Sequence, residues 1–244
     1  FSRLQMLVLD EADRMLDMGF IDDVETIASA TPATRQTVLF SATLDNAIDK
    51  VAAKLLKTPK RIQVASSKAK LDNIEQRLHY ADDMSHKNRL LNHVLRDETL
   101  KQAIVFTATK RDADTLADNL YAQGIAAAAL HGDMNQRERN RTLTRLRSGG
   151  LRVLVATDVA ARGIDVAAIT HVINFDLPKF AEDYVHRIGR TGRAGASGIA
   201  VSFASVKDSA HLSKIERYAG QRITSHIIPG LEPRIKPRFQ NNGI

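Results

Sequence analysis

The sequence predicts an α/β fold built on parallel sheets, and the alternation of two patterns along the chain supports this prediction. Short runs rich in leucine and β-branched residues alternate along the chain with amphipathic helical patterns, as expected for parallel sheets covered by helices. The 244 residues are 43% hydrophobic, which is sufficient for one large or two modest cores. No apolar run approaches the ~20 residues that span a bilayer, so we expect a soluble, cytoplasmic protein that does not enter a membrane.

The strands and helices are predicted from the period of the apolar residues. The predicted strands are residues 6–10, 37–40, 61–64, 76–80, 103–106, 126–130, 153–156, 171–175 and 199–203. The clearest predicted helices are residues 46–56, 87–95, 112–123, 136–146 and 207–218.

A polar stretch without periodicity, residues 65–73, has the composition of a linker. We therefore expect one domain in residues 1–64 and a second in residues 74–228. Residues 229–244 begin with Pro229, which interrupts regular structure, and continue as a basic tail that we expect to be mobile.

The charge balance favours a polyanionic partner. The chain has 35 lysines and arginines against 28 acidic residues, a formal net charge of +7. Such a charge attracts nucleic acid, although many basic proteins bind none. The chain has no cysteine, which excludes disulfides and cysteine-based zinc sites. Isolated histidines such as His79 and His93 fit surface or packing roles better than metal ligation.

An acidic segment, Asp10-Glu11-Ala12-Asp13, directly follows the apolar residues 7–9. Carboxylates at the end of a buried strand commonly hold a magnesium-bound triphosphate. In this interpretation Asp10 binds Mg²⁺, Glu11 orients and deprotonates the attacking water, and Asp13 supports them. The alternative is that these residues cap a helix and complement its dipole.

A hydroxyl-containing segment, Ser41-Ala42-Thr43, follows the predicted strand at residues 37–40 and precedes a predicted helix. Capping of that helix by a hydroxyl is the simpler interpretation. The functional alternative is a hydrogen-bonded latch between the acidic segment and a moving part of the protein. The local sequence does not distinguish the two.

Polar residues and a glycine follow the predicted strand at residues 153–156, in the segment that runs from Thr157 to Asp165. Ligands of open α/β sheets bind beyond the carboxyl ends of the strands. Arg162 and Asp165 lie so close to the apolar strand that they favour a binding site over a plain strand-to-helix turn.

The predicted helix at residues 136–146 is strongly basic. It continues into a run with one acid, Glu138, and five arginines: Arg137, Arg139, Arg141, Arg145 and Arg147. Like charges four residues apart cost a few tenths of a kcal/mol per pair unless a polyanion compensates. We therefore expect this helix to contact a phosphate backbone, although a solvated charged face is the usual alternative.

Residues 186–193, His-Arg-Ile-Gly-Arg-Thr-Gly-Arg, gather three arginines and a histidine on one segment. An arginine is permanently charged and donates two parallel hydrogen bonds to phosphoryl oxygens. A packed core has no need of such a cluster, so the segment is interpreted as binding a nucleotide or a nucleic acid. The glycines at positions 189, 192, 195 and 198 are interpreted as making the loop flexible.

Taken together and in this order, the segments resemble the DEAD-box RNA helicase family, and the resemblance covers essentially the whole chain. The segments that carry it are residues 8–13, 41–43, 104–109, Gln136 with Arg139, 157–165 and 186–193. Each motif is weak alone, but six in order are specific. Residues 230–233 look most like the bacterial RhlE-type branch.

The resemblance implies an ATP-dependent RNA helicase with two RecA-like domains, ATP in the cleft and RNA across both. Residues 1–64 look like the second half of the first domain, and residues 74–228 like a complete second domain. Proteins of ribosome assembly or RNA decay are the partner classes that the resemblance suggests. We expect the helicase to unwind short RNA duplexes or remodel RNA–protein complexes.

The resemblance also implies roles for individual residues. Asp10 and Glu11 would serve Mg²⁺ and water activation, and Arg190 and Arg193 would reach the γ-phosphate of ATP. The remaining assignments are Gly163 and Asp165 for the nucleotide, Asp13, Ser41, Thr43 and His186 for coupling hydrolysis to RNA separation, and Thr109, Gln136, Arg139 and Thr157 for the RNA backbone.

One hallmark is missing, because no G-x-x-x-x-G-K-[ST] phosphate-binding loop occurs in the sequence. We therefore expect a fragment from which upstream residues have been removed and which does not hydrolyse ATP alone. A non-catalytic RNA-binding protein is a rival interpretation, against which Glu11, Arg190 and Arg193 argue. A DNA helicase of related architecture is a second rival.

Overall fold

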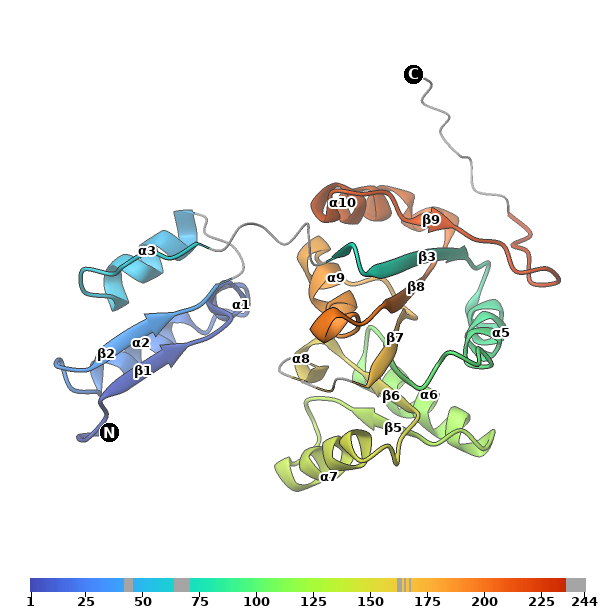
Figure 1. Cartoon of the computed structure of the whole chain (residues 1–244). Helices are drawn as coiled ribbons and strands as arrows, with labels where there is room; N and C mark the ends of the chain where they lie inside the picture. The colour runs from blue at the N-terminus through green and yellow to red at the C-terminus, as the bar shows by residue number, and fades with distance from the viewer. Residues whose placement is uncertain (42–45, 64–70, 162–163, 165, 167, 236–244) are drawn as a thin grey trace, which may run out of the picture. The chain divides into compact units, whose positions relative to one another are not determined.

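The computed structural model describes residues 1–41, 46–63, 71–161, 164, 166 and 168–235. The chain divides into two compact units (Figure 1), which we call unit 1 (Phe1–Ala65) and unit 2 (Ser66–Ile244). Both units contain parallel strands and helices, which confirms the predicted α/β class. No helix within the described ranges is long and apolar enough to cross a membrane.

Unit 1 is built on a small parallel sheet of two strands. Its elements are β1 (Met6–Leu9), α1 (Ala12–Asp17), α2 (Ile21–Ser29), β2 (Gln36–Leu39) and α3 (Asn46–Leu55). The core consists of Leu9 together with apolar residues of α2 and α3, namely Val24, Ala28, Val51 and Leu55. The predicted strand at residues 61–64 is wrong for residues 61–63, which are irregular; Val64 lies outside the described residues.

Unit 2 contains a seven-stranded sheet in which all the paired strands are parallel. Its strands are β3 (Ile74–Tyr80), β4 (Gln102–Phe106), β5 (Ala127–Leu130), β6 (Val153–Ala156), β7 (Ile169–Asn174), β8 (Gly198–Ala204) and β9 (Thr224–Ser225). Their order across the sheet is β5-β6-β4-β7-β8-β3-β9 (Figure 1). The inner strand β4, which lies between β6 and β7, is buried along its whole length, as expected for a strand covered on both faces.

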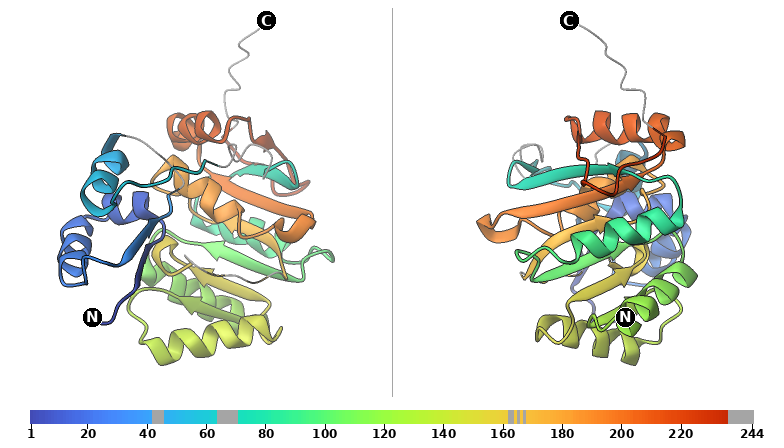
Figure 2. Two further views of the ribbon diagram at one scale, coloured as in Figure 1. Left: turned by 60° about the vertical axis from the view of Figure 1, so that its left-hand side comes forward. Right: turned by 90° about the vertical axis from the view of Figure 1, so that its right-hand side faces the viewer.

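Helices cover both faces of this sheet (Figure 2). They are α5 (Met84–Val94), α6 (Lys110–Ala122), α7 (Gln136–Arg147), α8 (Asp158–Ala161), α9 (Ala181–Ile188) and α10 (Ser209–Ala219). Because strand side chains alternate, Val105 packs with residues of α5 and α6, whereas Ile104 packs with residues of α7 and α8. Leu78 and its neighbours form a third cluster with α9 and α10.

The other predicted strands of unit 2 are found within two residues of their expected ends, while β9 was not predicted. The predicted helix at residues 207–218 is divided, since a 3₁₀ turn at Val206–Asp208 precedes α10. Periodicity could not reveal β9, because it has only two residues and pairs with a single strand, β3.

Candidate functional site

The acidic segment of unit 1 lies directly after β1. Asp10 is exposed, and its Oδ1 accepts a hydrogen bond of 2.9 Å from the amide of Glu11. Glu11 precedes α1 with φ 51° and ψ 48°, and its side chain makes no capping hydrogen bond. This left-handed conformation is uncommon for a residue with a side chain, and such strain concentrates at functional sites.

Ser41 lies at the same edge of the small sheet as the acidic segment. The amide of Phe40 donates to the carbonyl of Leu9 (2.7 Å), and the amide of Ala12 donates to the carbonyl of Phe40 (3.0 Å). The carboxyl ends of β1 and β2 are therefore held together. The half-buried Ser41 has no hydrogen-bond partner for its Oγ among the described residues, and Thr43 lies outside them.

The four residues expected to bind RNA follow three neighbouring strands of unit 2. Thr109 comes after β4, Gln136 and Arg139 lie on α7 after β5, and Thr157 comes directly after β6. Since β5, β6 and β4 are adjacent and parallel, these segments start from one edge of the sheet. The structure thus brings the backbone segments that carry these four residues to the same edge of the sheet.

Two of these side chains already have local partners. Thr109 caps α6, because its Oγ1 accepts from the amide of Asp112 (3.1 Å) and donates to the Asp112 carboxylate (2.6 Å). Gln136 donates to Asn140 one turn further along α7 (2.9 Å). These contacts fix the side chains at the surface of the unit.

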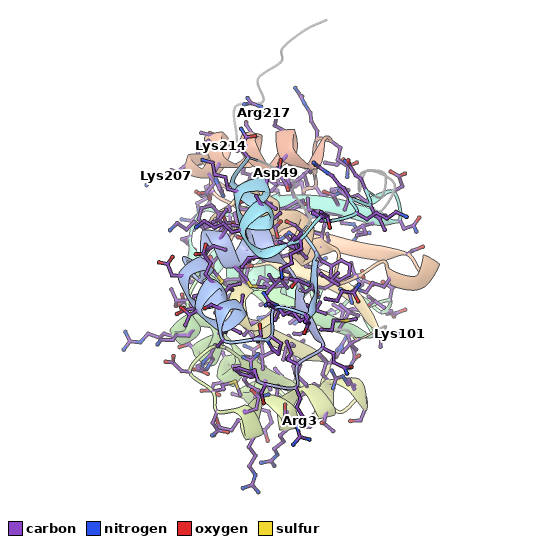
Figure 3. The ribbon with its side chains drawn as sticks, turned by 90° about the vertical axis from the view of Figure 1, so that its left-hand side faces the viewer. Arg3, Asp49, Lys101, Lys207, Lys214 and Arg217 are labelled. Atoms are coloured by element: carbon purple, nitrogen blue, oxygen red, sulfur yellow. The ribbon has the colours of Figure 1, made fainter. Side chains whose placement is uncertain are left out.

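The basic helix α7 presents most of its charge to solvent. Arg139 is half-buried, and its Nη1 lies 3.4 Å from the carbonyl oxygen of His131, whereas the other four arginines of the run are exposed. A capping box between Asn135 and Glu138 starts the helix. Basic side chains also lie along α10 and the turn before it, where Lys207, Lys214 and Arg217 are exposed (Figure 3).

One arginine of the arginine-rich segment, Arg187, is buried in the core, which the sequence interpretation did not expect. Arg187 is only 3% exposed, and it forms two hydrogen bonds with the Asp158 carboxylate (2.6 and 2.8 Å). Its Nη1 donates to Asn174 Oδ1 (3.0 Å) and to the carbonyl of Asp176 (2.6 Å). The guanidinium also lies 4.8 Å from the ring centroid of Phe106. The expectation that a packed core has no need of these arginines is therefore wrong for Arg187.

Further contacts extend this arrangement across the carboxyl ends of the strands. The Asp176 carboxylate accepts hydrogen bonds from Lys87 Nζ (2.7 Å) and from the amide of Ala108 (3.0 Å). Asn174 in turn donates to Ser202 Oγ (3.0 Å). Segments after β4, β6 and β7 are thus tied to α5 and α9. The position of Arg187 three residues after the buried Tyr184 was the sequence signal for its burial, because both lie on one face of α9.

The loop that carries Arg190 and Arg193 lies near the amino ends of β7 and β8. Arg190 Nη1 donates to the carbonyl of Ile164 (3.0 Å), and Arg193 Nε donates to the carbonyl of Gly189 (2.9 Å). The buried Thr191 donates to the carbonyl of Ile169, the first residue of β7 (2.7 Å). His186 is half-exposed on α9. Gly163 and Asp165, expected to contact the nucleotide, lie outside the described residues.

The interpretation of the glycines as sources of flexibility is wrong at two positions. Gly192 has φ +64°, and a Cβ there would lie 2.7 Å from Ile74. A Cβ on Gly198 would lie 2.6 Å from the Thr191 side chain and from the amide nitrogen of Gly192. Close packing between the loop and the sheet therefore requires glycine at both positions.

Comparison with known proteins identifies the family. A DEAD/DEAH box helicase profile matches residues 1–51, and a helicase conserved C-terminal domain profile matches residues 85–195. The chain is similar to Escherichia coli SrmB in its crystal structure bound to regulator of ribonuclease activity A, with 41% identity and a TM-score of 0.65 over 68% of this chain and 98% of that one. This chain belongs to the DEAD-box RNA helicase family.

Similarity to other family members extends over nearly the whole chain. The ATP-dependent RNA helicase SrmB of Haemophilus influenzae is 46% identical over 96% of this chain and 54% of the relative. CshA of Bacillus cereus is 42% identical over 96% of this chain and 45% of the relative. The chain therefore spans about half the length of these relatives. The narrower RhlE-type assignment is not confirmed by these SrmB and CshA matches.

The structure of Saccharomyces cerevisiae Dbp5 bound to RNA and ADP BeF3 is similar over 93% of this chain and 60% of that chain. The identity is 35% and the TM-score 0.82. This similarity supports the RecA-like helicase fold that the resemblance implied.

Proposed function

We propose that this protein acts as an ATP-dependent RNA helicase in the cytoplasm, separating short RNA duplexes or remodelling RNA–protein complexes. The observation that carries the proposal is the strained acidic turn, where Glu11 adopts a left-handed backbone two residues after Leu9, the buried end of β1. A helix cap does not require this geometry, and Glu11 makes no capping hydrogen bond. The strain instead supports a catalytic carboxylate held at a strand end.

The acidic turn offers a suitable donor set for Mg²⁺. Asp10 is exposed and uses Oδ1 to accept the Glu11 amide, which leaves Oδ2 for a cation. Mg²⁺ in nucleotide sites is commonly held by one or two carboxylates together with phosphate oxygens and water. When bound, ATP with Mg²⁺ supplies the phosphoryl group whose hydrolysis drives the cycle. Glu11 would orient and deprotonate the attacking water.

Residues of both units would contribute to nucleotide use and coupling. We assign Arg190 and Arg193 to the γ-phosphate because arginine stabilises the charge of the phosphoryl transition state. Gly163 and Asp165 are assigned to the nucleotide. Asp13, Ser41, Thr43 and His186 are assigned to coupling hydrolysis with RNA separation.

RNA would be bound through its backbone at the edge of unit 2 that carries Thr109, Gln136, Arg139 and Thr157. The exposed arginines of α7 support this assignment, because phosphate contacts are made mainly by arginine and lysine. Proteins of RNA decay are a partner class supported by the structure of SrmB with a regulator of ribonuclease activity. Ribosome-assembly proteins are a second proposed partner class.

The proposal is tested with the full-length protein by measuring ATP turnover and duplex separation with and without RNA. We expect RNA to stimulate turnover and Glu11→Gln to abolish it while leaving RNA affinity nearly unchanged. Competition between RNA and DNA of equal sequence addresses the DNA-helicase alternative, since only RNA carries 2′-hydroxyls. RNA binding without ATP turnover would instead favour a non-catalytic binding protein.

The 244-residue chain itself contains no G-x-x-x-x-G-K-[ST] segment, so we do not expect it to hydrolyse ATP alone. A phosphate-binding loop supplies backbone amides and a lysine that hold the transferred group. RNA-stimulated turnover by this chain would contradict that expectation.

A further inference from the structure

Unit 2 contains a cavity of about 460 Å³ that none of the proposed helicase residues lines. Its wall is made by alternate residues of β3, the end of α5 and the turn after it, Val201 of β8, and residues 226–228 after β9. This volume lies in the range of sites that bind small molecules, about 300 to 1,000 Å³. The cavity is therefore a second candidate site in the unit.

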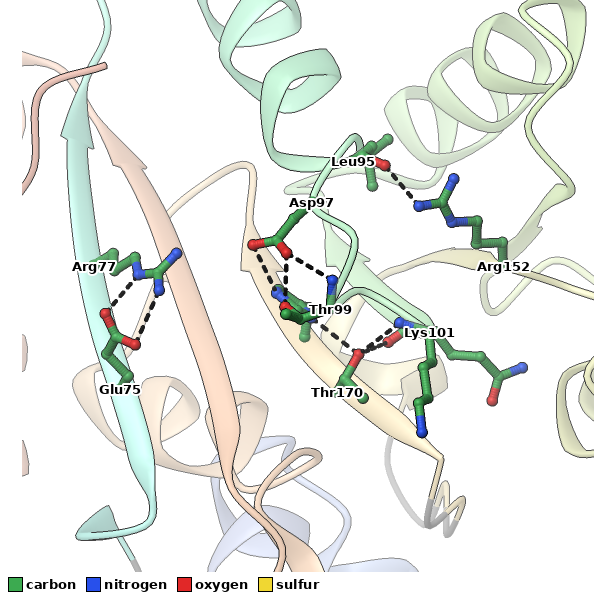
Figure 4. Close-up of polar contacts among 10 residues, drawn as sticks. Glu75, Arg77, Leu95, Asp97, Thr99, Lys101, Arg152 and Thr170 are labelled. Carbon is green, nitrogen blue, oxygen red and sulfur yellow. Dashed lines mark hydrogen bonds and ion pairs between the residues drawn. The ribbon is translucent and has the colours of Figure 1, made fainter. Parts of the chain in front are cut away.

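The register of β3 determines which charged groups face the cavity. Glu75, Arg77 and His79 alternate along one face of the strand, whereas Gln76 on the opposite face accepts a hydrogen bond from Tyr184 (2.8 Å). Arg77 donates through Nε and Nη2 to the two carboxylate oxygens of Glu75 (2.7 and 2.9 Å; Figure 4). The guanidinium is thereby fixed at the wall, and its Nη1 lies outside this pair.

The carboxylates at the cavity are already bound. Glu75 is paired with Arg77, and Asp97 accepts hydrogen bonds from the amide and hydroxyl of Thr99 (2.8 and 2.7 Å; Figure 4). By contrast, the exposed side chain of Arg96 makes no polar contact with any described residue. A charged donor of the wall thus remains for an anionic ligand.

His79 supplies a second, independent indication of a ligand. The residue is only 5% exposed, and its Nδ1 has no hydrogen-bond partner within the described part of the chain. Burial is the main cause that lowers the pKa of His79 to about 4, while a backbone hydrogen bond with His226 acts in the opposite direction. A neutral imidazole retains one N–H donor for a ligand.

We propose that this cavity binds a small molecule that carries a phosphoryl group next to an apolar part. Arginine and imidazole N–H groups would bind the phosphoryl oxygens, because charge-assisted hydrogen bonds of this kind are the strong ones. Val94, Val201 and Ile228 would contact the apolar part. The proposal concerns unit 2 alone and does not depend on helicase activity.

The test is a titration of the 244-residue chain with phenyl phosphate, followed by the chemical shifts of its backbone amides. We expect saturable binding with the largest shifts in residues 75–79, 93–97 and 226–228. Phenol, which lacks the phosphoryl group, should bind at least about tenfold more weakly, as expected for the loss of a charged hydrogen-bonding group. Equal binding of phenol, or shifts concentrated in residues 186–193, would overturn the proposal.

Two substitutions with a matched control complete the test. Arg96→Gln and His226→Gln should each weaken phenyl phosphate binding, by about tenfold for the arginine. Arg89→Gln changes an exposed arginine on α5 that does not line the cavity, and it should bind like the unchanged protein. Affinity unchanged in Arg96→Gln, or lowered equally in Arg89→Gln, would overturn the site.

Discussion

The inner strand β4 of unit 2 and the first strand of unit 1 differ in how they are covered. Every residue of β4 is buried, whereas Met6 and Val8, on alternate positions of β1, are 52% and 50% exposed. The buried apolar side chains of unit 2 form three clusters, whereas those of unit 1 form a single cluster of five residues. Parallel strands gain stability from cover on both faces. In the 244-residue chain, the two groups of candidate residues therefore rest on scaffolds of unequal stability.

The comparison predicts that ATP turnover is most sensitive to substitutions in the loop of unit 2 that packs closely against the sheet. If the full-length protein acts as proposed, Arg190→Ala or Arg193→Ala should lower its ATP turnover by roughly 10³ to 10⁵, equivalent to about 4 to 7 kcal/mol, because a transition-state contact is lost. RNA affinity without nucleotide should change little. Arg222→Ala, at an exposed position of the same unit, is the control. Normal turnover in both loop variants would remove these residues from catalysis.

The free energy of unfolding of unit 2 should be most sensitive to substitution of Arg187. Arg187→Met leaves Asp158 without its partner, and removal of one member of a buried ion pair costs about 3 to 5 kcal/mol. We expect the urea midpoint of unit 2 to fall while the unit 1 signals keep theirs, as followed by residue-resolved amide signals. The exposed Arg141→Met is the matched control, and equal stability of the two variants would show that the pair contributes little.

Equivalent core truncations should have unequal consequences in the two units. Leu55→Ala in unit 1 and Leu212→Ala in unit 2 each remove a buried leucine side chain, at a cost of about 2 to 4 kcal/mol. Because its core is small, unit 1 should lose amide protection in hydrogen exchange, whereas unit 2 should remain folded. Similar residual protection in both variants would contradict the difference in stability.

The buried His79 predicts a pH dependence confined to unit 2. Its pKa of about 4 lies below the ordinary value of 6.5, so the neutral form stabilises the fold. This stabilisation is complete above about pH 6.5 and declines as the pH falls towards 4, by about 3 kcal/mol, because one pKa unit corresponds to about 1.4 kcal/mol. His79→Gln should remove this part of the pH dependence of unfolding. A variant with the same pH profile would show that His79 does not cause it.

The smallest expected effect concerns the basic helix. Arg139→Ala should reduce the slope of log RNA affinity against log salt by about 0.7, because one phosphate contact with a single strand is lost. Unrelated RNA sequences should be weakened by similar factors, and Arg147→Ala near the helix end should do less. The measurement uses the full-length protein with a non-hydrolysable ATP analogue. An unchanged slope would indicate a merely solvated helix face.

The sequence was most reliable where structure follows from local pattern. Apolar runs located strands such as β4 and β6, because buried parallel strands are short and almost continuously apolar. The helical spacing from Tyr184 could indicate that Arg187 is buried, but local pattern could not reveal its partners Asp158, Asn174 and Asp176, which become neighbours only when the sheet forms.

The candidate residues show the same limit. The order of segments placed Thr109 and Thr157 after strands, but strand order was needed to bring them to one edge. The strain at Glu11 and the approach of Gly198 to Thr191 are properties of the folded backbone, which residue types alone do not encode.

The position of β3 also constrains how unit 2 is made during synthesis. This strand begins at Ile74, yet its neighbours β8 and β9 are translated more than a hundred residues later. Until then both hydrogen-bonding edges of β3 lack their strands, and an open edge can pair with another chain. Nascent chains of this protein should therefore depend on chaperones until β8 leaves the ribosome, when the unit can close cooperatively around its first strand.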